Sequence, residues 1–352
     1  MTTIEAALWP LSILYGTVAR LRARAYESGL FHPRRLDANV ISVGNLTVGG
    51  TGKTPMVLWI TQRLVQENKC VAILTRGYAR SAEAESDEVR IFRARLGDSV
   101  SLGVSPDRFD RGRELARTGI DWFVLDDGFQ HLQLARDADI VLIDALNPFG
   151  GGRLLPSGRL REPKAALGRA NVIVITRASH SPAIEAAVRR HSAAPIFYAQ
   201  TSLDSVCSLA PESASLEPYA APSAARPAAL ASPDQKKWFA FCGIGNPAAF
   251  IADLRAWGIL VVGQRFFHDH HRYTQSEFDD LAKAAYAARA DALICTEKDR
   301  FNLSAVKSLP LQTAYCRISL HIENANEFWA TIKSTVAASR AQSGVHAAKP
   351  SP

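Results

Sequence analysis

The sequence predicts an α/β fold built on a parallel sheet, because short β-branched runs alternate with longer polar segments. In the first half of the chain these runs lie at 39–45, 70–75, 122–127, 140–144 and 172–176. The segments between them are long enough for helices, and continuous runs of Val and Ile are typical of strands buried on both faces. The length of 352 residues suggests about two domains.

Strand-like runs resume in the second half, at 238–243, 259–263, 292–296 and 314–318, and predict a second, smaller α/β unit. The intervening stretch is rich in Ala, Ser and Pro and keeps no hydrophobic period, which indicates a linker or a long surface loop. The predicted boundaries are 1–28 for an N-terminal helix, 29–201 for the first domain, 202–237 for the linker, 238–338 for the second domain and 339–352 for a disordered tail.

Composition narrows the class of protein. Hydrophobic residues make up 47% and charged residues 21% of the chain, so it can bury a sizeable core and is neither wholly disordered nor collagen-like. The 5 cysteines are widely spread and form no CxxC pair, which argues against a disulfide framework or a structural zinc site. The formal net charge of +7 suits phosphate-rich partners or an anionic membrane surface.

The N-terminal segment 6–19 carries no charge and is followed by a group of arginines: Arg20, Arg22, Arg24, Arg34 and Arg35. The apolar run is shorter than the roughly 20 residues that a spanning helix needs. We therefore expect a peripheral or monotopic helix whose arginines face anionic cytoplasmic lipid headgroups. An ordinary first helix packed on the core is the alternative, and the absence of positive charge before the apolar run argues against an export signal.

A glycine-rich loop provides the most specific signal. It reads GNLTVGGTGKTP over 44–55, directly after one predicted strand and before a predicted helix. Glycines let backbone N–H groups surround phosphate oxygens, a Lys can reach the β and γ phosphates, and a Thr hydroxyl can ligate Mg²⁺. The expected nucleotide-binding residues are Gly49, Gly50, Thr51, Gly52, Lys53 and Thr54. Thr47 stands where the pattern G-x-x-x-x-G-K-[ST] has its first glycine, so the loop is a near match to that pattern and not a strict one. The strand, glycine-rich loop and helix together predict a P-loop NTPase-like fold.

Acidic residues follow the strand at 122–127. Asp126 and Asp127 end this hydrophobic run, and a strand-end aspartate beside a phosphate loop is where P-loop enzymes hold Mg²⁺. A turn or helix cap is the alternative interpretation, because Asp-Asp-Gly is also favourable turn chemistry. Thr54, Asp126 and Asp127 are thus the predicted metal-binding set.

A histidine-rich segment, FHDHHRYT over 267–274, allows more than one interpretation. Three histidines and an aspartate crowd into four neighbouring positions, 268–271. Adjacent residues rarely converge on one ion, so a solvated turn or a catalytic histidine competes with a metal site.

Together these motifs resemble the tetraacyldisaccharide 4′-kinase family of lipid A biosynthesis. The resemblance rests on GNLTVGGTGKTP, TRGY at 75–78, SDE at 86–88, DDGFQH at 126–131, LLPSGRLREP at 154–163, GIGNP at 243–247, FHDHHRYT at 267–274 and TEKD at 296–299. It extends from the N-terminal PLSILYG segment to TEKD. The motifs occur in the family's order, whereas the phosphate loop alone would indicate only nucleotide binding.

The resemblance implies ATP- and Mg²⁺-dependent phosphorylation of the 4′-hydroxyl of a tetraacylated glucosamine disaccharide 1-phosphate, at the cytoplasmic face of the bacterial inner membrane. By motif position it implies that Asp87 is the catalytic base and His270 its partner, with Lys53 and Asp127 at the reacting centre. Glu88, His131, Arg161 and Glu162 would lie at the periphery of the active site. Val89 follows Asp87-Glu88 where the family usually has proline. The family pattern therefore does not by itself fix the orientation of the Asp87 side chain.

A different class of protein is also compatible with the loop and the histidines: a membrane-associated P-loop ATPase or GTPase switch, or a metal-delivery factor. A nucleotide-binding structural protein at the membrane is a further possibility. We expect no nucleic-acid partner, because no dense basic patch interleaved with aromatic residues occurs, and we infer no obligate protein partner.

Overall fold

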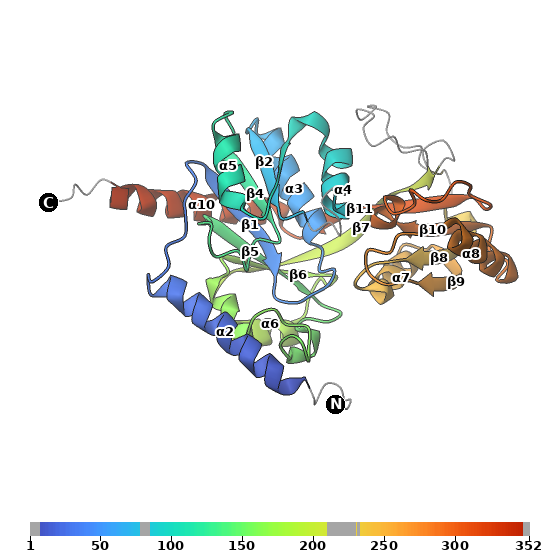
Figure 1. Cartoon of the computed structure of the whole chain (residues 1–352), viewed down its shortest axis with the longest axis horizontal. Helices are drawn as coiled ribbons and strands as arrows, with labels where there is room; N and C mark the ends of the chain where they lie inside the picture. Colours follow the sequence, from blue (N-terminus) through green and yellow to red (C-terminus); the bar gives the residue numbers. More distant parts are fainter. Residues whose placement is uncertain (1–7, 78–84, 210–229, 231–232, 348–352) are drawn as a thin grey trace. The chain divides into compact units, whose positions relative to one another are not determined.

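The computed structural model divides into two compact units (Figure 1). Unit 1 comprises Met1–Tyr78, Asp98–Gln200 and Leu320–Pro352, and unit 2 comprises Ala79–Gly97 and Thr201–Ser319. The structure describes residues 8–77, 85–209, 230 and 233–347. The predicted boundaries therefore differ from this division at two places: the segment that carries Asp87 groups with the second unit, and the chain returns to the first unit at Leu320.

Unit 1 contains a parallel sheet with the strand order β3-β2-β4-β1-β5-β6-β7. The strands are β1 (Asn39–Asn45), β2 (Val71–Thr75), β3 (Ser101–Val104), β4 (Trp122–Asp126), β5 (Ala138–Asp144), β6 (Val172–Thr176) and β7 (Ile196–Leu209). The helices of this unit are α2 (Trp9–Glu27), α3 (Lys53–Gln66), α5 (Arg108–Ala116), α6 (Pro182–Arg189) and α10 (Ala325–Ala347). The central strands are buried along nearly their whole length, as two-sided cover by helices requires.

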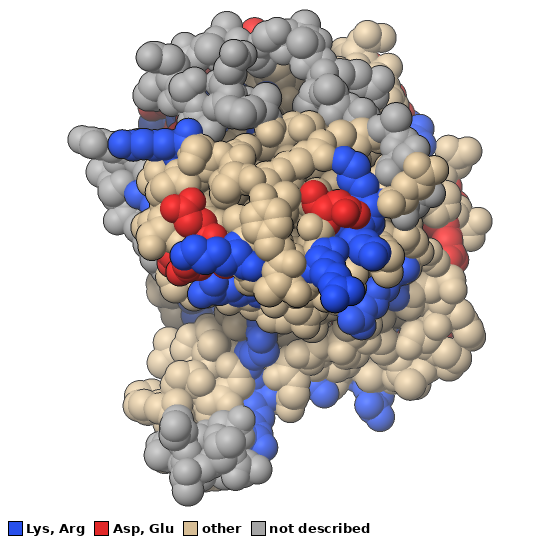
Figure 2. Space-filling model, turned by 90° about the vertical axis from the view of Figure 1, so that its right-hand side faces the viewer, with Lys and Arg blue, Asp and Glu red and all other residues tan. Residues whose placement is uncertain are grey.

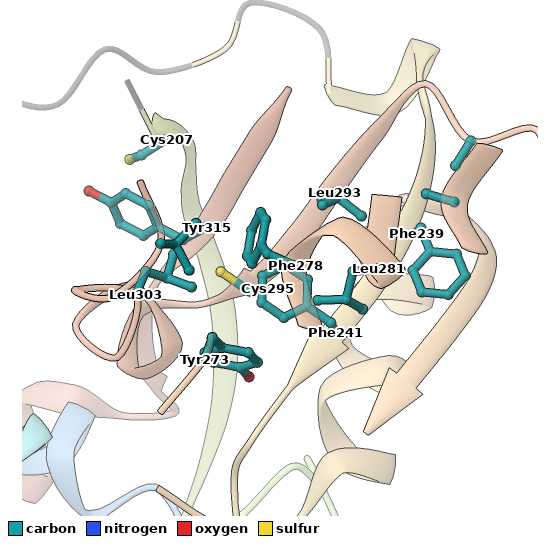
Figure 3. Packing of buried hydrophobic residues seen from close by; sticks show 13 residues of the cluster. Cys207, Phe239, Phe241, Tyr273, Phe278, Leu281, Leu293, Cys295, Leu303 and Tyr315 are labelled. Carbon is teal, nitrogen blue, oxygen red and sulfur yellow. The ribbon is translucent and has the colours of Figure 1, made fainter. Parts of the chain in front are cut away.

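Unit 2 contains a smaller parallel sheet with the order β11-β10-β8-β9, and the end of β7 lies beside β11. Its elements are α4 (Asp87–Leu96), β8 (Lys237–Cys242), α7 (Pro247–Ala256), β9 (Leu260–Phe266), α8 (Gln275–Ala287), β10 (Ala292–Thr296), α9 (Glu297–Arg300) and β11 (Thr313–Ile322). Its core is aromatic: the rings of Phe241, Tyr273 and Phe278 meet edge to face (Figure 3).

Short 3₁₀ turns occur in both units, at Gly97–Ser99, Gly150–Gly152, Lys164–Arg169 and Pro233–Gln235.

Helix α2 docks on unit 1 through small residues. The Ser12 hydroxyl lies 2.7 Å from the Ser157 hydroxyl, and a Cβ on Gly16 would come within 2.4 Å of Leu154 Cδ1. Large apolar side chains of α2, among them Leu14, Val18 and Leu21, are exposed. Within the part of the chain that the structure describes, no helix is both long and apolar enough to cross a membrane.

Charged side chains of both signs lie next to one another on the face of the molecule shown in Figure 2, where groups of Lys and Arg adjoin Asp and Glu. Positive side chains on that face therefore have negative neighbours, which offset their charge locally.

The predicted strands are confirmed, but two strands were not anticipated. The sequence analysis missed β3, which is short, and β7, whose apolar and polar residues are mixed along its half-buried length. Strand β7 also extends into the predicted linker, of which 210–229 and 231–232 lie outside the described residues. The disordered tail predicted from 339 is wrong as far as Ala347, because α10 continues to that residue. This segment includes good helix formers, and Ser339 and Arg340 make contacts with other parts of unit 1.

The C-terminal part of α10 contacts the buried carboxylate of Asp137. Asp137 accepts hydrogen bonds from the Ser339 hydroxyl at 2.9 Å and from Arg35 Nη1 at 2.6 Å, and Arg340 Nε lies 3.2 Å away. Its side chain is fully buried. Because a buried carboxylate requires compensating partners, the C-terminal helix contributes to the stability of the sheet near the starts of the central strands β1 and β5.

Replacing Arg340 with Leu should lower the free energy of unfolding by about 1 to 2 kcal/mol, because a buried carboxylate loses one of its charged partners. Urea unfolding followed by circular dichroism measures this difference. The control Lys333→Leu removes a more exposed ion pair of the same helix, 2.9 Å long, with Glu67. That change should cost less than about 1 kcal/mol. Equal losses in the two variants would contradict the role of Asp137.

Candidate active site

The glycine-rich loop lies between β1 and α3, as predicted. Gly52 caps α3 with φ 90°, and Gly49 has φ 121°, conformations that residues with a Cβ rarely adopt. These angles explain why glycines are needed here. Lys53 and Thr54 are the first residues of α3, so they stand where the helix N-terminus favours an anion.

The segment 159–161 runs antiparallel to the start of this loop. Val48 N donates to Arg159 O at 2.8 Å, and Arg161 N donates to Leu46 O at 2.7 Å. Between these bonds, Thr47 forms a β-bridge with Leu160. An extended residue held in a bridge needs no glycine conformation, which accounts for the threonine at the first position of the pattern.

Asp127 lies where three basic side chains meet. Its carboxylate is 3.6 Å from Lys53 Nζ and 2.6 Å from Arg161 Nη1, and its backbone carbonyl accepts a hydrogen bond from Arg108. Burial alone would raise the pKa of Asp127, but Lys53 and Arg161 outweigh it and lower that pKa below its ordinary value. Asp127 is therefore an ionised carboxylate at neutral pH.

Asp126 has different surroundings from its neighbour. It is buried at the end of β4, and its Oδ2 accepts a hydrogen bond from the Thr75 hydroxyl at 3.2 Å. The structure thus brings Lys53, Asp127 and Arg161 together and turns Asp126 toward β2. The two aspartates are not equivalent, although the sequence presents them as a pair.

One buried carboxylate oxygen in this cluster fits a bound Mg²⁺. Asp127 Oδ1 is a buried oxygen that accepts no hydrogen bond from the described residues, and it faces Lys53 Nζ. A hard carboxylate oxygen beside a lysine at a helix N-terminus is the donor type that Mg²⁺ prefers.

Two residues that the sequence analysis did not single out support this arrangement. Asn45 Oδ1 accepts a hydrogen bond from Lys53 Nζ at 3.2 Å, and Gln130 Nε2 donates to the Asn45 backbone carbonyl at 2.9 Å. Asn45 is fully buried. A buried amide at the end of a hydrophobic strand was the available signal, since such a group requires partners.

The predicted peripheral residues of unit 1 have separate environments. Glu162 is buried and pairs with Arg169 at 2.7 Å, so it stabilises the loop that carries Arg161. Burial, together with Arg108 and Arg136, lowers the pKa of His131 to about 4. His131 is thus neutral at pH 7 and cannot act there as a cation.

Asp87 and His270 meet in unit 2, although they are far apart in the sequence. Ser86 caps α4 by accepting a hydrogen bond from Val89 N, which places Asp87 in the first turn. His270 Nδ1 lies 2.8 Å from Asp87 Oδ2, and this contact raises the pKa of His270 above its ordinary value. The unusual φ of 58° at His270 helps to turn the backbone here. A buried carboxylate beside a histidine of raised pKa can accept and pass on a proton.

Glu88 adjoins this pair and forms an ion pair with Lys298 of α9. Burial opposes ionisation of Glu88, but Lys298 lowers its pKa to about 2. Glu88 therefore stays ionised at neutral pH.

The two other histidines of the 267–274 segment, His268 and His271, contact each other, and His271 also contacts Glu277. His271 Nδ1 lies 3.2 Å from His268 Nε2, and His271 Nε2 lies 3.1 Å from Glu277 Oε2. Over the described ranges, no group of three or more His, Cys, Asp or Glu side chains is arranged to hold a metal ion. The metal interpretation of the histidine segment gains no support from the geometry.

Comparison with known proteins decides the family. A family model described as tetraacyldisaccharide-1-P 4′-kinase matches residues 4–337. The chain belongs to this family. A tetraacyldisaccharide 4′-kinase of Halothermothrix orenii is 38% identical over 327 residues, covering 85% of this chain and 84% of the relative. One of Geobacter sulfurreducens is 40% identical over 311 residues, covering 83% and 82%.

A solved structure agrees with this assignment. The chain resembles the "apo" form of LpxK from Aquifex aeolicus in complex with ATP, with a TM-score of 0.67 and 26% identity, over 95% of this chain and 100% of that one. The predicted family, the kinase class and the P-loop NTPase-like fold are therefore confirmed.

The Asp87–His270 contact should make stability depend on pH. Because the pKa of His270 is raised in the folded state, its stabilising contribution is present below its unfolded pKa of about 6.5 and is lost as pH rises through the folded pKa. The difference in Tm between the wild type and His270→Gln should therefore be larger at about pH 5.5 than at about pH 9. Thermal unfolding at several pH values measures it.

The matched background for this test is Asp87→Asn, which removes the partner carboxylate. In that background the effect of His270→Gln should depend much less on pH. The same pH dependence in both backgrounds would show that another group causes it.

Proposed function

We propose that this kinase transfers the γ-phosphate of ATP to the 4′-hydroxyl of a tetraacylated glucosamine disaccharide 1-phosphate, with Asp87 as the general base. Family membership supports the reaction and the substrate class. The observation that carries the assignment of the base is the 2.8 Å contact between Asp87 and His270.

Phosphoryl transfer requires an attacking hydroxyl in line with the leaving group and cations near the transferred phosphate. Lys53 provides positive charge at the γ-phosphate, and the N-terminus of α3 binds the phosphate chain. Arg161 holds Asp127 ionised at this end of the sheet. Asp87 accepts the proton of the 4′-hydroxyl, and His270 orients Asp87 or relays the proton onward.

Thr54, Asp127 and Asp126 would hold Mg²⁺. The buried Asp127 Oδ1, which accepts no hydrogen bond from the described residues, is the observation that favours Asp127 in this set. When bound, Mg²⁺ neutralises phosphate charge as the phosphoryl group moves.

Helix α2 would bring the enzyme to its lipid substrate at the cytoplasmic face of the inner membrane. Leu14, Val18 and Leu21 are each more than half exposed, at 62%, 57% and 59%. A helix docked by small residues that turns large apolar side chains outward is suited to the interface between headgroups and acyl chains. Residues 1–7 of the predicted helix lie outside the described part of the chain.

Asp87→Asn should lower kcat by about 10² to 10⁴-fold and leave ATP binding intact, because the hydroxyl loses its proton acceptor. Lys53→Ala should lower kcat and also weaken ATP binding, because phosphate loses a cation. The assay follows γ-phosphate transfer from Mg·ATP to the tetraacylated disaccharide 1-phosphate in mixed micelles.

The control is Asp280→Asn in α8 of the same unit, where the carboxylate pairs with Lys283 on the surface at 2.9 Å. It should retain the wild-type kcat. Near-wild-type turnover by Asp87→Asn across the pH range would exclude Asp87 as the base. ATP hydrolysis without a phosphorylated lipid would instead favour a nucleotide-dependent switch.

The triple change Leu14→Ser, Val18→Ser and Leu21→Ser should reduce binding to vesicles of phosphatidylethanolamine and phosphatidylglycerol and leave ATP affinity unchanged, because it removes only exposed apolar area. Vesicle cosedimentation measures the bound fraction. Leu146→Ser is the control, since Leu146 is an exposed leucine of unit 1 outside α2. Unchanged vesicle binding by the triple variant would overturn the membrane role of α2.

A further inference from the structure

The carboxylate of Asp87 is held from two directions within unit 2. Besides the contact with His270, Asn302 Nδ2 donates to Asp87 Oδ2 at 3.2 Å. Asn302 is buried, and its amide also lies 3.4 Å from the Lys298 carbonyl of α9. Among the described residues, both contacts to the carboxylate therefore end on the same oxygen, Oδ2.

We propose that Asn302 is a positioning residue for phosphoryl transfer, which fixes Oδ2 of Asp87 together with His270 and leaves Oδ1 to receive the substrate proton. This inference rests on the proposed role of Asp87 as the base. Asn302 acts through Asp87 and need not touch the substrate. A carboxylate with one oxygen fixed has a defined direction for the other oxygen, which is what proton transfer from an aligned hydroxyl requires.

The helix that carries Asp87 is fastened by other contacts, so Asn302 is not needed to hold the backbone. Arg90 Nη1 donates to the Phe301 carbonyl at 2.6 Å, and Arg95 forms an ion pair with Glu297 at 2.8 Å. The Glu88–Lys298 pair adds a third connection between α4 and α9. None of these side chains bonds to the Asp87 carboxylate. The backbone of Asp87 can thus stay in place while its side chain turns about χ1 and χ2.

Several charged groups surround this carboxylate within unit 2. His270 and Asp269 come from the 267–274 loop, with His270 Nε2 3.9 Å from Asp269 Oδ1. Glu88 lies on α4, and Lys298 on α9 interacts with both Glu88 and Asp87. Since Asn302 is uncharged, its effect is separable from these: it donates to the ionised carboxylate and so favours that form.

The test is Asn302→Leu, which removes the donor at similar volume, with Arg90→Leu as the matched control. Both changes remove one hydrogen bond between α4 and the segment 297–302, but only Asn302→Leu removes a bond to Asp87. We expect Asn302→Leu to lower kcat about tenfold, to leave KM for ATP within about twofold, and to move the acid limb of the kcat profile to higher pH. Arg90→Leu should lower Tm without moving that limb.

Asn302→Asp is a second variant of nearly the same shape, in which an acceptor replaces the donor. It should move the acid limb further than Asn302→Leu, because two carboxylates then face each other. In the Asp87→Asn background, Asn302→Leu should cause no further loss of kcat beyond about twofold.

The proposal is overturned if Asn302→Leu lowers only Tm, as Arg90→Leu does, or if it lowers kcat equally in the Asp87→Asn background. These outcomes differ from failure of the proposed function. If Asp87→Asn alone kept the wild-type kcat, Asp87 would not be the base and the inference about Asn302 would fall with it.

Discussion

The ion pairs of Asp127 are the interaction on which the candidate active site of unit 1 depends. This residue connects the end of β4, the first turn of α3 and the loop that carries Arg161. It does so with φ 51°, a conformation that costs free energy and persists only where the surroundings determine it. Burial disfavours its charge, and two cations from different segments offset that cost. Folding by itself thus fixes Lys53, the residue proposed to bind the ATP phosphates, beside Asp127, the residue proposed to bind Mg²⁺.

Unit 2 also contains a buried carboxylate that joins several segments, but there burial has the larger effect on the pKa. Asp299 is almost fully buried and accepts hydrogen bonds from Gly243 N, the Tyr273 hydroxyl and the Thr296 hydroxyl. Burial outweighs these donors and raises its pKa. The hydroxyl of Tyr273 turns from the aromatic cluster toward this carboxylate, so the core is linked to the start of α9 (Figure 3). Asn302, which contacts Asp87, follows α9 after one intervening residue.

The parts of the site that the sequence predicted are those set by local chemistry. A strand, a glycine-rich loop and a helix follow one another within 39–66, and each requirement for glycine or lysine can be read from neighbouring residues. The pairing of Asp87 with His270 spans 183 positions, and only the resemblance to a family suggested it. Asn45 and Asn302 remained hidden because a single amide carries no spacing pattern, and its importance depends on which buried group it meets. The end of α10 was predicted wrongly for the same reason, since Ser339 and Arg340 are ordered by Asp137, about 200 positions earlier in the chain.

Asp87 belongs to unit 2 because the helix that carries it, α4, groups with that unit. The crossover from β2 to β3 leaves unit 1, and its helix α4 is bound by side-chain contacts to α9 in unit 2. Its contacts to α9 include buried and partly buried ion pairs, whose partners would be left as uncompensated charges if α4 were displaced. The proposed base is thus tied to the unit that also carries His270 and Asn302, whereas the lysine for phosphate belongs to the other unit.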